Sequence, residues 1–525
     1  MGASDPLVGV PSSGGGREEK SVLPVKGSPK GHPFMIEPPH PGGVSMGVSR
    51  RNLLTGAAAA TAVVAFDPTR QSWLGHAAAQ GCPGAIRIPR LDGELLFDAA
   101  SLDVGATDFG HLVERRPAAL LKPGSVRDVQ RAVRFANRHG ISVAMRGQAH
   151  SCFGQAQALC GIVIDTRTLD AIHSIDASGA WVDAGVKWST LTLATLAEGL
   201  TPRVLTDYLE LSVGGVLSVG GIGGAMNRYG FVADNVEALE VVTGDGCLHT
   251  LRHGDLFRSV PGSLGQFALI VRAKVSLDPA PTQARVYDLV YTDLSQFIAD
   301  QRTVANDERF DFLEGQLIAN DSGGFDFLLQ AAMWFDAGSE PDDAALLAGL
   351  SPVATTTTDQ PYFDWLNRVA AAEGFLRSIG LWETPHPWSD LFLDDRSVES
   401  YMRWTLDRLS PADLGFGLAL LYPFKRRATR ARYVATPNSR LVWAFDLLRF
   451  PFPDPAVIQA LLDQNRELYE EAARLGGKRY PVSALDFDQA DWIEQYGPRW
   501  RSFASRKRRY DPRNVLTPGQ HVFGS

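Results

Sequence analysis

The chain has 525 residues with a formal net charge of −8, 45% hydrophobic residues and 21% charged residues. This length exceeds that of a typical single domain, and the composition is that of a globular protein, so we expect two packed domains after a leader. The acidic balance argues against a nucleic-acid binder, because such proteins usually carry a basic face. We interpret the short basic cluster Ser505–Tyr510 as a solvated helix face.

Residues 1–45 are rich in Gly, Pro and Ser, and we interpret them as a disordered leader or a mis-assigned start. Paired arginines, Arg50 and Arg51, then precede an apolar run and a small-residue site at Ala77 and Ala79. This pattern predicts a twin-arginine-type signal peptide over residues 46–80. The alternative is a chance arginine pair before an alanine-rich helix. From this signal we expect an exported protein, periplasmic or extracellular. No other segment is long and apolar enough for a membrane span, so we expect the mature protein to be soluble.

Residues 92–277 alternate between helical and strand patterns and are predicted to form an α+β domain. A helical pattern follows Ser125, which is expected to cap the helix together with Asp128, and Gly140 is expected to end it. The further elements predicted in this part are short buried strands within 141–147 and 161–166, a helix within 188–200, a hairpin over 238–251 and a strand over 267–275.

The Pro-bearing polar segment 276–285 marks a plausible domain boundary. Residues 278–477 have a different texture, with longer strand patterns at 325–335 and 440–450 and a helix pattern at 454–477. Residues 478–525 form a closing part with a turn-rich, aromatic end.

Two stretches rich in small residues are candidates for a ligand-binding site. RGQAHSCFGQAQ (146–157) holds His150, and TDYLELSVGGVLSVGGIGGAMNRYG (206–230) is dense in glycine. So many glycines are unsuited to a helix or strand interior, and they predict a backbone that lies against a ligand, with N–H groups turned to phosphates or carbonyls. The alternative is a set of tight β-turns. The tract lacks the spacing of a Rossmann or P-loop motif.

The cysteines and the remaining histidines give weaker indications of function. Cys82, Cys152, Cys160 and Cys247 contain no C-x-x-C pair, and we favour small buried thiols, although Cys152 and Cys160 could bridge in an oxidising compartment. His249 and His253 flank a hairpin and are expected to face solvent. No histidine spacing indicates a metal site.

Seven stretches occur in an order that resembles the cytokinin dehydrogenase family, of the vanillyl-alcohol-oxidase or PCMH-type FAD-binding superfamily. They are RGQAHSCFGQAQ, TDYLELSVGGVLSVGGIGG, RYGFVADNVEALEVVTGDG, GSLGQFALIVRAKV, FLEGQL, PHPW and YDPRNVLTPGQ. The resemblance covers residue 92 to the C-terminus. It implies an α+β fold in which a two-part FAD-binding domain, residues 92–277 and 478–525, carries an inserted α+β substrate domain, residues 278–477, built on an antiparallel sheet.

The resemblance also implies site residues. His150 matches the histidine that is joined covalently to the flavin, and the absence of cysteine from SVGGIGG implies a single link. Ala149 stands where the family has glycine, which puts the local backbone angle in question. The implied cofactor contacts are Met145, Gly147, Gln148, Ala149, Ser151, Gln155, Asp207, Ser212, Ser218, Ile222, Ile270, Tyr480, Thr517 and Gln520.

Three further residues match the substrate side of the family's site. Asp207 matches the carboxylate that accepts a hydrogen bond from the substrate amine, and Glu314 matches a glutamate at the substrate entrance. Their alternative roles are a turn cap and a sheet-rim carboxylate. Trp388 is expected to wall the substrate pocket, whereas His386 beside it is interpreted as structural.

The implied function is the FAD-dependent oxidation of the secondary allylic amine of N6-alkenyl adenines. A flavin takes hydride from carbon, a carboxylate receives the proton, and water splits the imine into adenine and an aldehyde. One alternative keeps the fold but acts on a sugar, alditol or phenolic alcohol, and another is a flavin-fold protein that only binds a ligand. We expect a monomer that passes electrons to a quinone-like acceptor or O2.

Overall fold

The computed structural model describes residues 63–67, 69–70, 72–75 and 86–524, and for residues 63, 64 and 75 only the backbone. Residues 1–62, most of the predicted signal segment and Cys82 lie outside the described residues. The described residues of that segment include β1 (Val63–Asp67) and β2 (Ser72–Gly75), which form a small sheet with β3 (Ile86–Arg87). Phe66 of β1 is buried and its ring lies 6.0 Å from that of Phe135.

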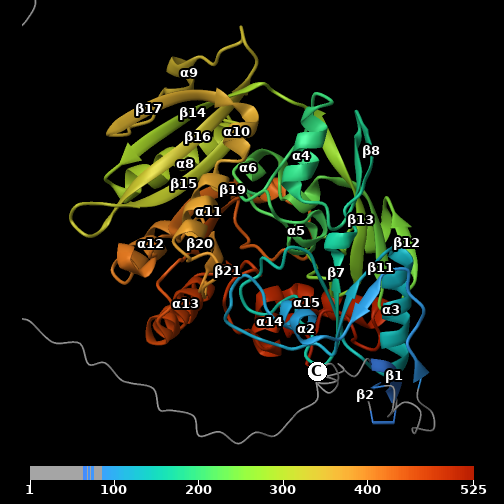
Figure 1. The fold of residues 1–525 in the computed structure, drawn as a ribbon. Coiled ribbons are helices and arrows are strands. Elements are labelled where there is room, and N and C mark those ends of the chain that lie inside the picture. The colour runs from blue at the N-terminus through green and yellow to red at the C-terminus, as the bar shows by residue number, and fades with distance from the viewer. Residues whose placement is uncertain (1–62, 68, 71, 76–85, 525) are drawn as a thin grey trace, which may run out of the picture. The chain divides into compact units, whose positions relative to one another are not determined.

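A four-stranded sheet begins the main body of the fold (Figure 1). Its order is β4 (Glu94–Leu96), β5 (Ala119–Lys122), β7 (Ile162–Asp165) and β6 (Val143–Arg146), with β5 and β6 parallel to β7. Helix α3 (Val126–His139) connects β5 to β6 and buries Val129 and Val133, as its apolar spacing predicts. Gly140 ends the helix in the left-handed region, with φ 66°.

A six-stranded sheet follows. Its order is β12 (Leu248–Leu251), β11 (Val236–Thr243), β13 (Ala268–Pro279), β9 (Gly179–Asp183) and β8 (Ile172–Asp176), and β10 (Leu200–Pro202) pairs with β13. The helices of this part and of the segment before it are α2 (Ala99–Ala106), α4 (Trp188–Leu196), α5 (Val213–Val219), α6 (Met226–Tyr229) and α7 (Gly254–Phe257).

An antiparallel sheet of eight strands forms the next part of the chain. Its order is β17 (Ala354–Pro361), β14 (Gln283–Tyr291), β16 (Phe325–Phe335), β15 (Phe312–Ala319), β19 (Leu418–Lys425), β20 (Leu441–Leu448), β18 (Ser389–Asp394) and β21 (Lys478–Arg479). The accompanying helices are α8 (Leu294–Asp307), α9 (Asp343–Leu347), α10 (Tyr362–Leu366), α11 (Val369–Ser378), α12 (Val398–Leu406) and α13 (Pro455–Arg474).

The two faces of this sheet have different neighbours. Because side chains alternate along a strand, Leu421 and Phe445 lie on the face that packs in one core with Phe297 of α8. Tyr422 lies on the opposite face, in a separate cluster with Phe231 and Tyr480. The second face is therefore available to form the wall of a site between the sheet and the first part of the chain.

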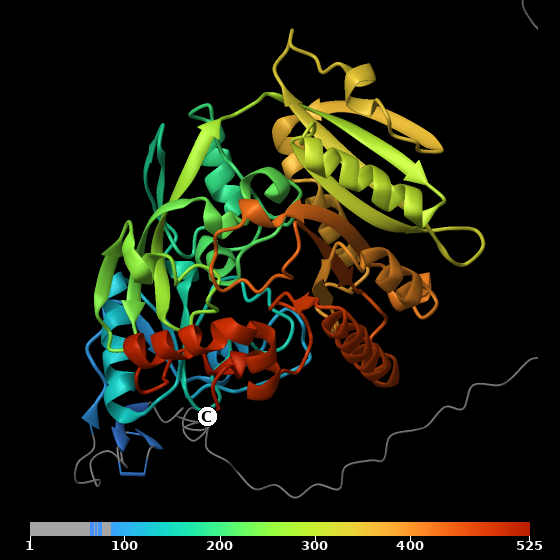
Figure 2. The ribbon, with the colours of Figure 1, turned by 180° about the vertical axis from the view of Figure 1, so that it is seen from behind.

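The C-terminal part returns to the first sheets through α14 (Gln489–Tyr496) and α15 (Trp500–Tyr510), which lie beside the N-terminal elements in both views (Figure 2). After α15 the tail pairs with β6: the Val143 N–H donates to Val515 O at 2.7 Å, and the Thr517 N–H donates to Val143 O at 2.8 Å. The predicted fold is confirmed: a mixed helix and sheet body with a second, sheet-based part.

Several local expectations need correction. Ser125 precedes α3, but its Oγ donates to Asp92 Oδ2 at 2.8 Å instead of capping the helix. Asp128 accepts the N–H groups of Asp92 and Gly93 at 2.8 and 2.7 Å, so it ties an earlier turn to the helix start. The cluster interpreted as a solvated face contains Lys507, which is buried and pairs with Asp511 at 2.8 Å.

The glycine tract is more helical than predicted, because α5 runs through its first glycines. A Cβ added at Gly214 would lie 2.6 Å from that of Ala184, so the glycine lets this helix pack closely against β9 and its loop. The thiols also differ from expectation. Cys152 is buried, but Cys160 and Cys247 are exposed, and all three are free. Among the described residues, no helix is long and apolar enough to cross a bilayer.

Candidate active site

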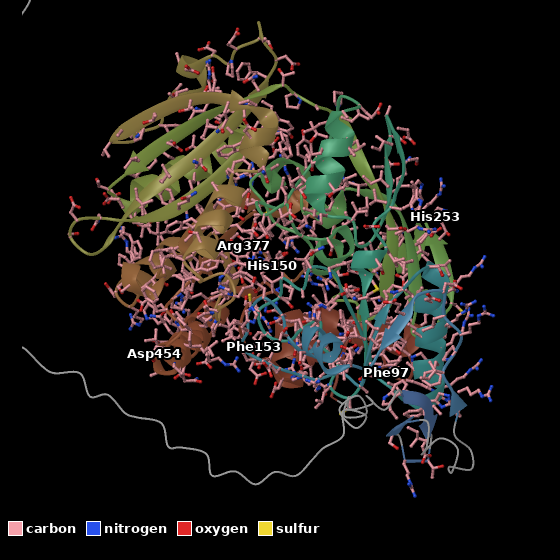
Figure 3. The ribbon with its side chains drawn as sticks, viewed as in Figure 1. Phe97, His150, Phe153, His253, Arg377 and Asp454 are labelled. Carbon is pink, nitrogen blue, oxygen red and sulfur yellow. The ribbon has the colours of Figure 1, made fainter. Side chains whose placement is uncertain are left out.

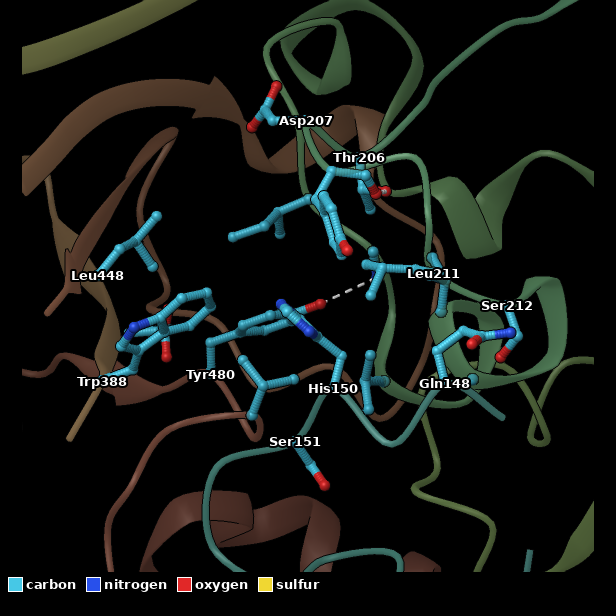
Figure 4. A pocket seen from close by; sticks show the side chains of 18 of the residues that line it. Gln148, His150, Ser151, Thr206, Asp207, Leu211, Ser212, Trp388, Leu448 and Tyr480 are labelled. Carbon is cyan, nitrogen blue, oxygen red and sulfur yellow. Dashed lines mark hydrogen bonds between the residues drawn. The ribbon is translucent and has the colours of Figure 1, made fainter. Parts of the chain in front are cut away.

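One cavity of about 500 Å³ collects the residues singled out in the sequence. Its wall comes from the histidine loop, the glycine tract, the C-terminal tail and the second face of the eight-stranded sheet (Figure 4). The predicted site residues found there are Met145, Gly147, Gln148, Ala149, His150, Ser151, Gln155, Asp207, Ser212, Ser218, Ile222, Ile270, Glu314, Trp388, Tyr480, Thr517 and Gln520. The structure thus brings together groups that are up to 375 positions apart in the chain.

The histidine loop leaves β6 and lies against the glycine tract. A Cβ added at Gly147 would lie 1.9 Å from Ser212 Oγ, so only glycine allows this approach. Ala149 has φ 54°, in the left-handed region, and its carbonyl accepts the Phe109 N–H at 2.8 Å. The backbone φ angle at residue 149 is therefore one that favours glycine, and here an alanine adopts it.

His150 stands within a stack of aromatic rings. Its ring centroid lies 3.8 Å from that of Phe109, which is stacked in turn on His386 at 4.2 Å, and Tyr208 lies 4.9 Å from His150. Burial, with a smaller contribution from His386, lowers the pKa of His150 to about 3. The imidazole is therefore neutral at physiological pH. His150 is half-buried at the cavity wall, whereas His253 lies at the exposed periphery (Figure 3). His249 is exposed as well.

His386 is fully buried, and its two ring nitrogens lie 2.6 Å from Phe109 O and 3.1 Å from Leu381 O. These contacts agree with the structural role expected from the sequence. The neighbouring Trp388 donates from Nε1 to Arg449 O at 3.1 Å, and its ring meets that of His150 edge-on at 5.5 Å. The PHPW stretch therefore supplies an aromatic wall beside the histidine.

Asp207, Glu314 and Arg368 form a charged cluster at another part of the cavity wall. Arg368 Nη2 lies 2.6 Å from Asp207 Oδ1 and 3.2 Å from Glu314 Oε2. The guanidinium also lies over the rings of Phe312 and Trp365, at 4.7 and 4.5 Å from their centroids. Both carboxylates therefore share one fixed cation.

The charges in this cluster shift each other's protonation. Burial, followed by the negative charge of Asp207, raises the pKa of Glu314 to about 7. Burial acts to lower the pKa of Arg368, but the carboxylates of Asp207 and Glu314 outweigh it, and the pKa stays above its ordinary value. Glu314 is only 4% exposed on the central strand β15, so the sheet-rim interpretation is wrong.

Sequence reasoning missed Arg368, which lies between α10 and α11 in a stretch without a recognisable motif. It also missed two acids, Asp390 of β18 and Asp446 of β20, which line the same cavity. For Asp446 a signal did exist, because it is the single acid in the otherwise apolar strand LVWAFDLL.

The cavity has features that suit a flavin nucleotide. The close packing at Gly147 joins two backbone segments along one wall. Gln520 Oε1 in the tail is buried without a hydrogen-bond partner among the described residues, so a donor on a ligand would satisfy it. Neutral His150 offers a ring nitrogen at the cavity wall. These residues fit FAD.

Comparisons with known proteins agree with this arrangement. Residues 117–252 match the model of an FAD binding domain, and residues 343–523 match "Cytokinin dehydrogenase 1, FAD and cytokinin binding". An uncharacterized oxidoreductase, ORF5 in the fasciation locus of Rhodococcoides fascians, is 37% identical over 431 residues, which are 81% of this chain and 98% of that protein. Cytokinin dehydrogenase 4 of Arabidopsis thaliana is 33% identical over 483 residues, 82% of this chain and 92% of the relative.

A solved structure resembles the fold as well. It is 6-hydroxy-D-nicotine oxidase from Arthrobacter nicotinovorans, with a TM-score of 0.64 and 22% identity. The match covers 82% of this chain and 98% of the oxidase. At this identity the likeness concerns the fold alone, and it agrees with the FAD-binding part and the sheet-based part described above.

Proposed function

Because this chain belongs to the cytokinin dehydrogenase family of FAD-dependent oxidoreductases, we propose that it oxidises the secondary amine of N6-alkenyl adenines to an imine. Water then cleaves the imine to adenine and an aldehyde. The observation that carries the proposal is that Asp207, held by Arg368, lines the same cavity as His150. A base for the amine and an anchor for the cofactor thus lie in one site.

FAD is the cofactor that the FAD binding domain implies, and we propose that His150 forms its single covalent link. Bound FAD supplies the acceptor for the hydride that leaves the carbon beside nitrogen. His150 is suited to the link because its pKa is lowered to about 3, which leaves a ring nitrogen free to act as a nucleophile. A covalent link also suits an exported enzyme, which cannot reload cofactor outside the cell.

Asp207 would accept the N–H of the substrate amine and receive its proton as the C=N bond forms. Arg368 holds the half-buried carboxylate of Asp207 in place, because its Nη2 donates a hydrogen bond to Asp207 Oδ1 at 2.6 Å. Glu314 holds its own proton up to about pH 7, so that below this pH the cation remains paired mainly with Asp207. General-base assistance of this kind is worth roughly 10²- to 10⁴-fold in rate.

The cavity wall supports a planar aromatic substrate over a sugar or alditol. The rings of Trp382 and Trp388 both pack against Phe450 at the wall, with centroids 5.9 and 5.8 Å from that of Phe450. Flat apolar walls favour stacking of a purine, whereas a polyol needs a hydrogen-bond partner for each hydroxyl that loses water.

Asp207→Asn tests the proposed base. The variant keeps the shape of the side chain but removes the negative charge, so flavin reduction by N6-isopentenyladenine should slow by at least about 10²-fold. The flavin should remain bound. Asp278→Asn is the matched control, because Asp278 also pairs with an arginine, Arg203 at 2.8 Å, but does not line the cavity. An unchanged rate in Asp207→Asn would remove this residue from the mechanism.

We further propose export through the twin-arginine pathway, function as a monomer, and a quinone-like compound or O2 as electron acceptor. Cleavage after Ala79 would remove β1 and β2, with buried Phe66. N-terminal sequencing of the protein secreted by a twin-arginine-competent host tests the export proposal: a start near residue 80 supports it, and an intact leader in the cytoplasmic fraction contradicts it.

A further inference from the structure

A short segment that follows α2, residues 107–110, lies against the histidine loop. The Phe109 N–H donates to Ala149 O at 2.8 Å, and the N–H of the next residue donates to Ser151 O at 3.1 Å. These two hydrogen bonds hold the backbone on both sides of His150. We call residues 107–110 the clamp.

The carboxyl of Asp108 in the clamp holds the part of the loop that follows His150. Its Oδ2 accepts the Ser151 hydroxyl at 3.0 Å and the Gly154 N–H at 2.7 Å. Asp108 is 4% exposed, and burial raises the pKa of its carboxyl to about 7. The carboxyl is thus partly protonated near neutral pH, so its hydrogen bonds, and not its negative charge, connect the clamp to the loop.

The ring of Phe109 lies flat against the imidazole of His150. The two rings are stacked with centroids 3.8 Å apart and an angle of 27° between their planes. On His386 the Phe109 ring is stacked at 4.2 Å and 11°. His386 also contacts the backbone of the clamp: its Nδ1 lies 2.6 Å from Phe109 O, and its N–H donates to Gly110 O at 2.8 Å. Phe109 is therefore fixed in place beside His150.

The clamp acts on the site only through the loop. Asp108 and Phe109 are not among the residues that line the cavity, so their side chains reach a ligand there only through His150 and its neighbours. Asp108 Oδ1 is buried and has no hydrogen-bond partner among the residues that the structure describes. A buried acid of this kind is costly in stability, and a role in the site explains why the position holds one.

We propose that Asp108 and Phe109 are positioning residues for the attachment of FAD to His150. The Phe109 ring fixes the plane of the imidazole, and the Asp108 carboxyl fixes the loop that carries it. This inference rests on the covalent link proposed above, and it adds the residues that make the link form.

The step that the clamp assists is the formation of a bond between a ring nitrogen of His150 and a methyl carbon of the flavin. The methyl carbon and the imidazole each lose a proton, and two electrons pass to the flavin. The quinone-like acceptor or O2 then removes these electrons. Because a misplacement of about 1 Å can cost about 10²-fold in rate, a fixed imidazole reacts faster than one that is free to turn.

The test follows the covalent fraction of the bound FAD in the full-length protein, at intervals after expression is induced. Acid precipitation separates flavin that stays with the chain from flavin that is released. Phe109→Leu keeps an apolar side chain but removes the stacked ring. Its covalent fraction at early times should be lower than that of the wild type by about 10-fold or more, while the total FAD bound per chain stays the same.

A pair of variants at Asp108 tests the carboxyl separately. Asp108→Ala removes both hydrogen bonds to the loop, so its early covalent fraction should also fall by about 10-fold. Asp108→Asn keeps an oxygen that accepts the same two hydrogen bonds, so it should recover most of the loss. This pair decides the inference if Phe109→Leu does not accumulate.

Phe135→Leu and Asp300→Ala are the matched controls. Phe135 is a buried phenylalanine of α3, and Asp300 is a buried acid of α8 that accepts the Ser351 N–H at 2.7 Å. Neither residue lines the cavity, so both variants should lose stability but keep the covalent fraction of the wild type. An equal fall in the controls, or an unchanged fraction in both Phe109→Leu and Asp108→Ala, overturns the inference.

The wild type separates this inference from the proposed function. If acid releases all of its flavin, the proposed link is absent and the inference is overturned with it. If the flavin is covalent but N6-isopentenyladenine does not bleach it, the proposed substrate is wrong, and the covalent fractions of the variants still decide the inference.

Discussion

The guanidinium of Arg368 donates a hydrogen bond from Nη2 to Asp207 Oδ1 at 2.6 Å, although 161 positions separate the two residues in the chain. The same nitrogen lies 3.2 Å from Glu314 Oε2. Arg368 therefore ties the start of the glycine tract to strand β15 of the eight-stranded sheet. In the proposed reaction it acts through Asp207, as a positioning residue.

Replacement of Arg368 should weaken the base without emptying the cofactor site. Arg368→Met removes a charged hydrogen bond worth roughly 1.5–3 kcal/mol, so flavin reduction should slow by about 10- to 100-fold. Glu314 would also lose the cation that lowers its pKa, so the ionisation of Glu314 in the pH profile should move to higher pH. Arg368→Lys should restore part of both effects. Stopped-flow reduction across pH measures them, and a slower rate with an unmoved pH profile would indicate a purely structural role.

Glu314 should add an ionisation near pH 7 to the profile of kcat/KM. Its pKa is raised from 4.5 to about 7, so the folded protein holds this proton between these values, whereas the unfolded chain releases it. Above pH 7 the ionised Glu314 competes with Asp207 for Arg368, so Asp207 is held less firmly and the rate falls. Glu314→Gln should abolish this step. A step near pH 7 that persists in Glu314→Gln would have to come from another group.

The raised pKa of Glu314 also makes the folding stability depend on pH. Because the folded pKa of Glu314 lies above the unfolded one, stability falls as the pH rises through the window from about 4.5 to 7. The free energy of unfolding of Glu314→Gln should therefore depend less on pH in this window than that of the wild type. Denaturant unfolding of the two proteins at pH 5 and pH 8 measures the difference, and identical pH dependences would contradict the assigned shift.

His150→Ala should leave a protein that binds FAD only reversibly. The stacking partners Phe109 and Tyr208 remain, but the nitrogen that would form the link is absent. Acid precipitation should leave yellow colour with the wild-type pellet and release it from the variant. His253→Ala serves as the control, because His253 is exposed and distant from the cavity wall. Release of flavin from the wild type itself would rule out a covalent link.

Ala149→Gly should stabilise the protein, against the usual trend for this substitution. An L-residue at φ 54° is strained by roughly 1–2 kcal/mol, and glycine relieves this at the cost of unfolded-state entropy, which leaves a net gain of up to about 1 kcal/mol. Ala144→Gly, in the strand just before the loop, should instead destabilise, because Ala144 is buried in regular strand conformation. Thermal unfolding compares the stabilities of the two variants with that of the wild type. Destabilisation by Ala149→Gly would show that the backbone at Ala149 is not strained.

Features carried by contiguous residues were predictable from the sequence. The histidine loop, the glycine tract and helix α3 depend on local spacing and composition, and the structure has all three, with the tract more helical than expected. Arg368 and the Asp390–Asp446 pair were not predictable, because their neighbours come from distant strands and helices. The stacking of His150 on Phe109 likewise joins residues 41 positions apart through a loop contact that no periodicity encodes.

We propose that the enzyme oxidises an N6-alkenyl adenine at its amine, in the cavity that holds His150 and Asp207. Anaerobic mixing of the holoenzyme with N6-isopentenyladenine, in parallel with an alditol and a phenolic alcohol, tests this proposal. The adenine compound alone should bleach the yellow flavin, and adenine should appear in the solution. Bleaching by the alditol or the phenol, with the colour intact in the adenine sample, would contradict it.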